Sequence, residues 1–308
     1  MTGPSRSYAL VTPARNEYAN LERLAGCLID QVHRPTAWVI VDNGSTDATP
    51  ELARELARAH PWVHLIEIPS GRQERGGPIV RAFHAGVALL DRLPDVVVKL
   101  DADVSMEPDY FDRLMQAFAA DPLLGIASGT CYERDGEGWR EQHMTGSSVW
   151  GCARAYRAAC LEQILPLEEQ MGWDGIDVLK AEVRGWHSGT LVDLPFRHHR
   201  VEGARDGARR SAYAAQGRAA HYMGYRTWYL VARALNRSRA EPAALAMIGG
   251  FAAAALMRRP RCADPQVVAH LRFEQRLTLL PARIREAAGR RQPPPSGDGV
   301  EYRGQLPR

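Results

Sequence analysis

Two carboxylates stand together at the end of a short apolar run. Asp101 and Asp103, separated by Ala102, directly follow residues 96–100. In an open α/β sheet the carboxyl ends of the strands face the ligand crevice, and Mg²⁺ is typically held by one or two carboxylates together with phosphate oxygens. The Asp-x-Asp pattern therefore indicates a metal-bridged phosphate site, although Asp is also common in turns that follow strands.

Two further polar segments follow earlier apolar runs. They are residues 12–17, Thr-Pro-Ala-Arg-Asn-Glu, and residues 42–47, Asp-Asn-Gly-Ser-Thr-Asp. Carboxylates in such loops can accept hydrogen bonds from a ribose hydroxyl or a base N–H, but turns and helix caps use the same residue types without any ligand. Each loop alone leaves both interpretations open. No G-x-G-x-x-G follows the first run, which argues against a dehydrogenase.

The elements that must position these residues alternate between short apolar runs and helical patterns, as βαβ units of a mostly parallel sheet do. Thr49 is expected to cap the second helix, with Pro50 at its first position. We expect strands at residues 8–12, 38–41, 63–68, 95–100, 125–132 and 190–195, and helices at 21–29, 50–59, 77–90, 109–118 and 150–164. The segment 171–177 is expected to lead into a short helix that stops at Gly185, and further helices are expected from about 242 and 264.

Composition excludes several classes of protein. The chain has 308 residues, 45% of them apolar and 24% charged, as in an ordinary soluble protein. A net charge of +3 is too small to argue for a nucleic-acid partner. The five scattered cysteines contain no C-x-x-C pair, so neither a disulfide framework nor a zinc site is expected, and a reducing cytoplasm is the simplest compartment.

No signal segment and no run of about 18 apolar residues is evident. The nearest approach is the Ala-rich stretch 243–257, followed by Arg258 and Arg259. It could be a packed helix of small residues or an element at a membrane surface. Because one face carries little charge, packing is the favoured interpretation.

Taken together, four motifs resemble the family-2 type glycosyltransferases of the GT-A fold, which transfer a sugar from a nucleotide-diphosphate donor. The motifs lie at 13–17, 41–47, 101–103 and 173–174, in the family's order, and the resemblance covers about residues 8–230. It implies an α/β, Rossmann-like nucleotide-diphospho-sugar transferase fold with a mostly parallel central sheet and a C-terminal helical appendage.

The expected organisation follows from this resemblance and from a change of composition at Arg197. A catalytic domain is expected over 1–200, with a nucleotide-binding half at 1–105 and an acceptor half at 106–200. A basic loop and helical region follows at 201–290, and a disordered tail is expected at 291–308 because of its Pro-rich start.

The resemblance also implies roles for individual residues. Pro13, Glu17 and Asp42 would line the nucleoside pocket, and the Asp pair would hold the metal and the donor's ribose or diphosphate, with Asp103 as the direct metal ligand. The expected nucleotide-binding positions are Pro13, Ala14, Arg15, Glu17, Asp42, Gly76, Arg81, Asp101, Ala102 and Asp103.

An inverting transfer needs a carboxylate to take the proton of a hydroxyl nucleophile. Asp174 is the expected base, eleven residues before Gly185, as the family places it. Trp173 stands where the family usually has an acidic neighbour, so Asp177 remains a competing base or a support for the loop.

Further groups could neutralise a leaving diphosphate. The family often places a metal-binding histidine where His198 and His199 lie, and only one of two adjacent side chains would normally point inward. Arg205, Arg209 and Arg210 could clamp phosphate or form a solvated basic loop. Arg75 and Arg81 are equally ambiguous, beside a helix start at Gly76 and Gly77 that could offer N–H groups to an anion.

The sequence therefore predicts an inverting, metal-dependent glycosyltransferase of the hexosyltransferase class, using Mg²⁺ or Mn²⁺. Its donor would be a nucleotide-diphosphate sugar, by family frequency a UDP-sugar, and its acceptor a hydroxyl of a glycan, a lipid-linked or a small molecule. We expect a cytoplasmic protein, with a peripheral contact at the inner face of the membrane as the second interpretation. The alternatives are a sugar-phosphate nucleotidyltransferase, which would need a Gly-rich loop after the first strand, and a catalytically inactive nucleotide-sugar-binding protein.

Overall fold

The computed structural model describes residues 6–69, 76–142, 148–199, 209–279, 281 and 302–303. Most of the tail expected at 291–308 lies outside these residues, and β10 (Tyr302–Arg303) pairs with β9. The other strands are β1 (Tyr8–Ala14), β2 (Ala37–Asp42), β3 (Val63–Glu67), β4 (Val96–Leu100), β5 (Val104–Met106), β6 (Leu124–Asp135), β7 (Gly138–Glu141), β8 (Ala153–Arg157) and β9 (His187–His198).

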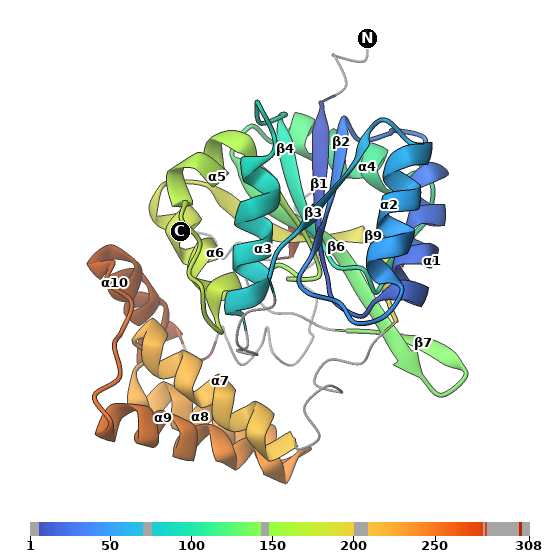
Figure 1. The fold of residues 1–308 in the computed structure, drawn as a ribbon. Helices are drawn as coiled ribbons and strands as arrows, with labels where there is room; N and C mark the ends of the chain where they lie inside the picture. The colour runs from blue at the N-terminus through green and yellow to red at the C-terminus, as the bar shows by residue number, and fades with distance from the viewer. Residues whose placement is uncertain are drawn as a thin grey trace.

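Helices alternate with these strands in the first half of the chain and follow one another after β9 (Figure 1). They are α1 (Tyr18–Ile29), α2 (Thr49–Ala59), α3 (Gly77–Ala88), α4 (Tyr110–Ala120), α5 (Ala158–Ile164), α6 (Trp173–Val183), α7 (Arg209–Met223), α8 (Thr227–Ser238), α9 (Ala246–Leu256) and α10 (Pro265–Glu274), with 3-10 turns at Pro242–Leu245 and Leu277–Leu279.

One sheet orders the strands β10-β9-β6-β8-β4-β1-β2-β3, with β5 paired to β9 and β7 to β6. The strands β3, β2, β1 and β4 are parallel, as the βαβ pattern predicts. β8 enters antiparallel between β4 and β6. The carboxyl ends of β1, β2 and β4 therefore meet at one edge, which is where the predicted site residues lie.

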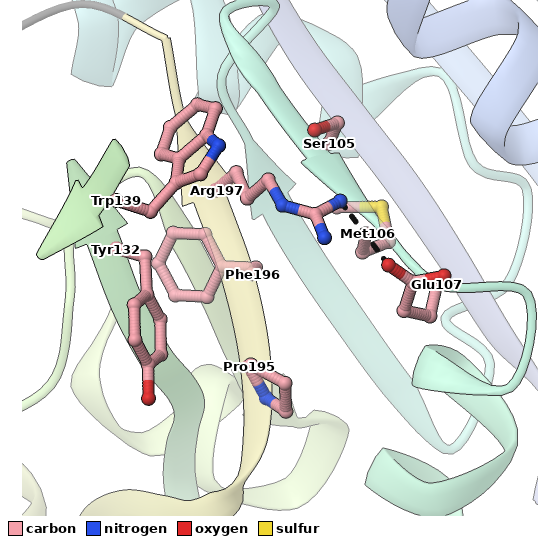
Figure 2. Close-up of a pocket in the computed structure, with 8 residues that line it drawn as sticks. All are labelled: Ser105, Met106, Glu107, Tyr132, Trp139, Pro195, Phe196 and Arg197. Carbon is pink, nitrogen blue, oxygen red and sulfur yellow. Dashed lines mark ion pairs between the residues drawn. The ribbon is translucent and has the colours of Figure 1, made fainter. Parts of the chain in front are cut away.

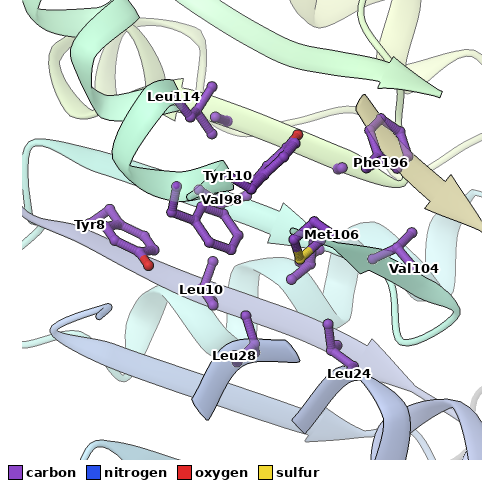
Figure 3. Close-up of a cluster of buried hydrophobic side chains, with 14 of the residues drawn as sticks. Tyr8, Leu10, Leu24, Leu28, Val98, Val104, Met106, Tyr110, Leu114 and Phe196 are labelled. Atoms are coloured by element: carbon purple, nitrogen blue, oxygen red, sulfur yellow. The ribbon is translucent and has the colours of Figure 1, made fainter. Parts of the chain in front are cut away.

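The sheet is buried on both faces, which explains its continuous apolar runs. Along β4, Val96 and Val98 pack into one cluster with β1, α1 and α4, shown in Figure 3. Val97 points to the opposite face, into a second cluster with α3, α5 and α6. Because side chains alternate along a strand, Lys99 shares the α6 face with Val97.

One predicted helix is wrong. The segment 150–164 contains β8, and helix α5 begins only at Ala158. The Ala- and Arg-rich stretch favours a helix locally, but helix propensity is a weak preference that tertiary context overrides. Here the backbone of β8 pairs with strands on both sides, and all five of its residues are buried.

The predicted cap at Thr49 is displaced by one residue, because Thr49 is the first residue of α2 and Ala48 precedes it. The Thr49 hydroxyl donates to Asp47 Oδ1 at 2.5 Å and accepts the Glu17 N–H at 2.9 Å. The side chain therefore joins two loops and does not cap its own helix.

The C-terminal helices α7, α8 and α9 pack together below the sheet in the view of Figure 1. Gly217 and Gly250 allow α7 and α9 to touch backbone to backbone, since a Cβ on either would lie 2.0 Å from a carbonyl oxygen of the other helix. The favoured interpretation of the Ala-rich stretch, a packed helix of small residues, agrees with this crossing. Among the described helices, none is both long and apolar enough to cross a bilayer.

Candidate functional site

The two loops predicted to meet a nucleoside are held to each other. Asp42 accepts hydrogen bonds from the N–H groups of Gly44 and Ser45, both at 3.2 Å, and from the Ser45 hydroxyl. Asn16, at a φ of 55°, accepts the Thr46 N–H at 2.7 Å. Asp42 thus stabilises the turn that follows it, as one of the two interpretations of this loop predicts. The remaining predicted residues of the first loop are Pro13 and Arg15, which are half-buried, and Ala14 and Glu17, which are buried.

Asp101 lies beside a buried lysine that the sequence interpretation treated only as part of a strand. Lys99 Nζ is 2.5 Å from Asp101 Oδ1 and donates to the Gly151 carbonyl at 2.7 Å, and its side chain is 3% exposed. Burial and the nearby Asp103 raise the pKa of Asp101, while Lys99 opposes the rise. With 27% of its side chain exposed, Asp101 still reaches the surface of the crevice.

Asp103 meets His198 across the junction of β5 and β9. His198 Nε2 lies 3.5 Å from Asp103 Oδ1, and Nδ1 lies 3.1 Å from Glu133 Oε1. Burial lowers the pKa of His198, but hydrogen bonding to Asp103 and Glu133 outweighs it and raises the pKa to about 11. Without a bound cation His198 is therefore an imidazolium between two carboxylates.

His199 points elsewhere. Its Nε2 lies 2.7 Å from Ser105 Oγ, and its ring packs edge-on against Trp139 at 5.2 Å. Burial, together with Arg23 and Arg134, lowers its pKa to about 4. Of the two predicted histidines, only His198 is thus placed beside the Asp pair by a side-chain contact.

Asp174 and Asp177 lie one turn apart on α6 in different surroundings. Asp177 is enclosed: Arg154 donates to it through Nε at 2.9 Å and Nη2 at 2.8 Å, and the Tyr156 hydroxyl donates at 2.5 Å. Burial raises the pKa of Asp177 to about 6 against the opposing charge of Arg154. These contacts assign Asp177 a structural role.

The carboxylate of Asp174 makes no hydrogen bond or ion pair within the described part of the chain, and the residue is half-buried. Its backbone carbonyl accepts from Arg154 Nη2 at 2.5 Å, so the clamp on Asp177 also fixes the turn that carries Asp174. A Cβ at Gly151 would lie 3.5 Å from Asp174 Oδ2. Because Lys99 donates to Gly151 and lies 5.7 Å from the Trp173 ring centroid, Asp101 and Asp174 share one neighbourhood.

The start of α3 packs against the segment before α6. Gly76 has a φ of +85°, and a Cβ there would lie 2.5 Å from the backbone of Gln170. Arg81 pairs with Glu169 at 3.2 Å, so its guanidinium is already partly engaged. Arg209 pairs with Glu241 at 2.8 Å and Arg210 is exposed. Arg75 and Arg205 lie outside the described residues.

A hollow of about 290 Å³ opens next to β5, β7 and β9, as Figure 2 shows. Trp139 lies between Arg134 and Arg197, and Arg197 pairs with Glu107 at 3.1 Å. The residues that line it include none of those predicted from the sequence.

Sequence reasoning missed three charged residues that organise the site: Lys99, Glu133 and Arg154. Lys99 and Arg154 have a weak signal in hindsight, because each is a charge in a run that must be buried, whereas Glu133 begins a charged stretch and has no such signal. Lys99 interrupts an apolar strand two residues before Asp101, and Arg154 stands in a segment misread as a helix.

The model of Glycosyl transferase family 2 matches residues 9–173, which is more than half of the chain. Undecaprenyl-phosphate mannosyltransferase of Micrococcus luteus is 33% identical over 62% of this chain and 77% of its own length. Polyprenol monophosphomannose synthase of Mycolicibacterium smegmatis is 35% identical, over 41% of this chain and 46% of its own length.

Solved structures resemble the fold. A mannosyltransferase from Pyrobaculum calidifontis, in complex with GDP-Man and Mn²⁺, superposes with a TM-score of 0.55 at 16% identity, covering 93% of this chain and 88% of its own. The 1–349 fragment of S. aureus TarS with UDP-GlcNAc gives 0.54 at 17% identity over 70% and 65% of the two chains. At such identities the likeness shows the fold alone.

Proposed function

The chain belongs to glycosyl transferase family 2 and has the GT-A fold, and from this premise we propose that it transfers a sugar from a nucleotide-diphosphate donor to a hydroxyl acceptor with inversion. Family and fold were both expected from the motifs and are confirmed. The observation that carries the proposal is Asp174, an acid with no internal partner among the described residues, held beside the Lys99 and Asp101 pair.

The proposed reaction forms a bond between the acceptor oxygen and the anomeric carbon while the bond from that carbon to the diphosphate breaks. Asp174 takes the hydroxyl proton as the nucleophile attacks, a contribution of about 10²- to 10⁴-fold. Arg154 holds the Asp174 turn in place through its bond to the backbone carbonyl. Lys99 keeps Asp101 oriented at the crevice, where we place the donor's ribose or diphosphate.

The residues beside Asp103 fit a divalent cation, because carboxylate oxygen and imidazole nitrogen are donor types that Mn²⁺ accepts and the two lie 3.5 Å apart. When bound, Mg²⁺ or Mn²⁺ would be held by Asp103 and His198 and would neutralise charge on the leaving diphosphate. His198 would have to give up its proton, so we expect proton release on binding.

The acceptor is proposed to be lipid-linked and reached at the inner face of a membrane, because the relatives' names refer to undecaprenyl phosphate and polyprenol. The chemistry separates two kinds of acceptor. A phosphate oxygen is already ionised at neutral pH and needs no base, whereas a hydroxyl does. The effect of Asp174→Asn on turnover therefore reports which oxygen attacks.

The central experiment combines donor binding with turnover. Thermal shifts with UDP-, GDP- and dTDP-sugars, with and without Mn²⁺, should identify a donor because a ligand stabilises the state that binds it. Asp174→Asn should retain that shift and lose about 10²- to 10⁴-fold in turnover, while Asp91→Asn, an exposed control, should match the wild type. Full turnover by Asp174→Asn with a hydroxyl acceptor would remove the proposed base.

A matched variant tests the metal. Asp103→Ala should abolish the Mn²⁺-dependent part of donor binding, because it removes the proposed oxygen ligand. A calorimetric titration that shows unchanged Mn²⁺-dependent binding would refute this assignment. Formation of a nucleotide-diphosphate sugar and pyrophosphate from a nucleoside triphosphate and a sugar 1-phosphate would instead indicate a nucleotidyltransferase. A bound donor with no turnover would indicate an inactive binding protein.

A further inference from the structure

Two cysteines lie beside His198 that neither the motifs nor the proposed mechanism uses. Cys131 is on β6, and Cys152 immediately precedes β8; both are buried. One donor atom each from Cys131, Cys152 and His198 lie within 4.8 Å of one another. These three residues are far apart in the chain, so no spacing motif marks them, and the fold brings them together.

The donor set has a definite chemical preference. Thiolate sulfur and imidazole nitrogen select thiophilic ions such as Zn²⁺ over Mg²⁺. With Zn–S near 2.3 Å and Zn–N near 2.0 Å, tetrahedral ligands lie about 3.5 to 4 Å apart, so a modest closing of the cluster would suffice. The three donors leave a fourth position of a tetrahedral site for a solvent molecule.

We propose that Cys131, Cys152 and His198 form a second cation site specific for thiophilic divalent ions such as Zn²⁺, with a solvent molecule at the fourth position. Binding would replace the two thiol protons and the imidazolium proton, which are released to solvent. A consequence, which rests on the proposed function, is inhibition, since His198 cannot bind this ion and the donor's metal together.

Binding is tested first without reference to catalysis. The full chain, freed of metal with a chelator, is titrated with Co²⁺ and Zn²⁺. Wild type should give the thiolate-to-Co²⁺ charge-transfer absorption and bind Zn²⁺ at 1:1, whereas Cys131→Ser and Cys152→Ser should lose the absorption and bind Zn²⁺ at least about 10-fold more weakly. Cys160→Ser, at a buried cysteine on α5, is the matched control and should behave as wild type.

The unmodified chain supplies a measurement that does not depend on the variants folding. Zn²⁺ should slow alkylation of Cys131 and Cys152, read by peptide mass mapping, and leave Cys160 unaffected. Absence of both the Co²⁺ absorption and this protection in wild type would overturn the site. Zn²⁺ inhibition of sugar transfer that persists in Cys131→Ser and Cys152→Ser would overturn the competition alone. Zn²⁺ bound through the cysteines in a protein that transfers no sugar would leave the site standing and remove the proposed function.

Discussion

The molecule has two acid pairs, Asp101 with Asp103 after β4 and Asp174 with Asp177 on the first turns of α6, and each contains one acid bound to a buried cation. Asp101 has Lys99, and Asp177 has Arg154. The pairs differ in closure: Asp177 is 1% exposed and receives three side-chain hydrogen bonds, whereas the Asp101 side chain is 27% exposed.

The difference separates acids that hold the fold together from acids that remain available to a ligand. A fully enclosed carboxylate with its bonds satisfied has no capacity left for chemistry, and its removal leaves an uncompensated charge. A half-open one keeps a face toward the crevice. A buried cation beside an acid can therefore stabilise the fold, as Arg154 does at Asp177, or orient an acid that stays accessible, as Lys99 does at Asp101.

The largest expected effect is on stability, from Asp177→Asn. Loss of this charge leaves the buried Arg154 guanidinium unpaired, so the free energy of unfolding should fall by about 3 to 5 kcal/mol. Asp174→Asn, three residues earlier, should stay within about 0.5 kcal/mol of wild type because the Asp174 carboxylate makes no hydrogen bond or ion pair with any described residue. Urea unfolding measures both. Equal losses of unfolding free energy in the two variants would contradict the distinction between an enclosed Asp177 and an accessible Asp174.

A second variant tests the contrast between the pairs. Lys99→Met removes the cation beside Asp101 and the donor to Gly151, and should reduce the free energy of unfolding by about 1 to 3 kcal/mol. The loss should be smaller than that of Asp177→Asn because Asp101 can turn its charge toward water. A loss as large as that of Asp177→Asn, in the same urea experiment, would show that the two pairs are equally closed.

The smallest effect is expected at a half-buried pair that joins α6 to α10. His270 on α10 lies 3.0 Å from Glu182 on α6, and hydrogen bonding to Glu182 raises the pKa of His270 above 6.5 despite partial burial. A raised pKa means that the protonated form stabilises the folded state, so this stabilisation is complete below about pH 6.5 and is lost as the pH rises through the folded-state value.

The difference in unfolding free energy between wild type and His270→Gln should therefore be at most about 1 kcal/mol at low pH and shrink toward zero as the pH rises. Thermal unfolding across that range measures it. A difference that grows with pH would show that the neutral imidazole makes the stabilising contact.

Much of the fold was predictable because its signals are local. The parallel strands β1, β2, β3 and β4 are visible in the sequence as apolar runs, and the ordered motifs indicate the glycosyltransferase family. The segment 150–164 was not predictable in this way, because what makes Ala153–Arg157 a strand is the presence of partners on both sides, and that is set by distant parts of the chain.

The candidate site likewise has a part that local sequence predicts and a part that long-range contacts determine. The crevice position of Asp101 and Asp103 could be read from a strand end, but the partners that decide their state could not. The role of Lys99 depends on its hydrogen bond to Gly151, and that of His198 on the pairing of β9 with β5, and neither contact is local in the sequence. Sequence spacing indicates which acids are candidates for the site, whereas long-range pairing determines which of them already bind a cation within the fold.

The pairing of β9 with β5 also determines at what stage of synthesis and folding the site can form. Ser105 and His199 touch across 94 residues of chain, and closing so long a loop costs entropy that only later contacts repay. During synthesis the amino-terminal strands emerge first, so Asp103 is made long before the imidazole that will face it. Until β9 is added, β5 and one edge of β6 stay open to strands of other chains, and His198 reaches Asp103 only in chains made at least that far.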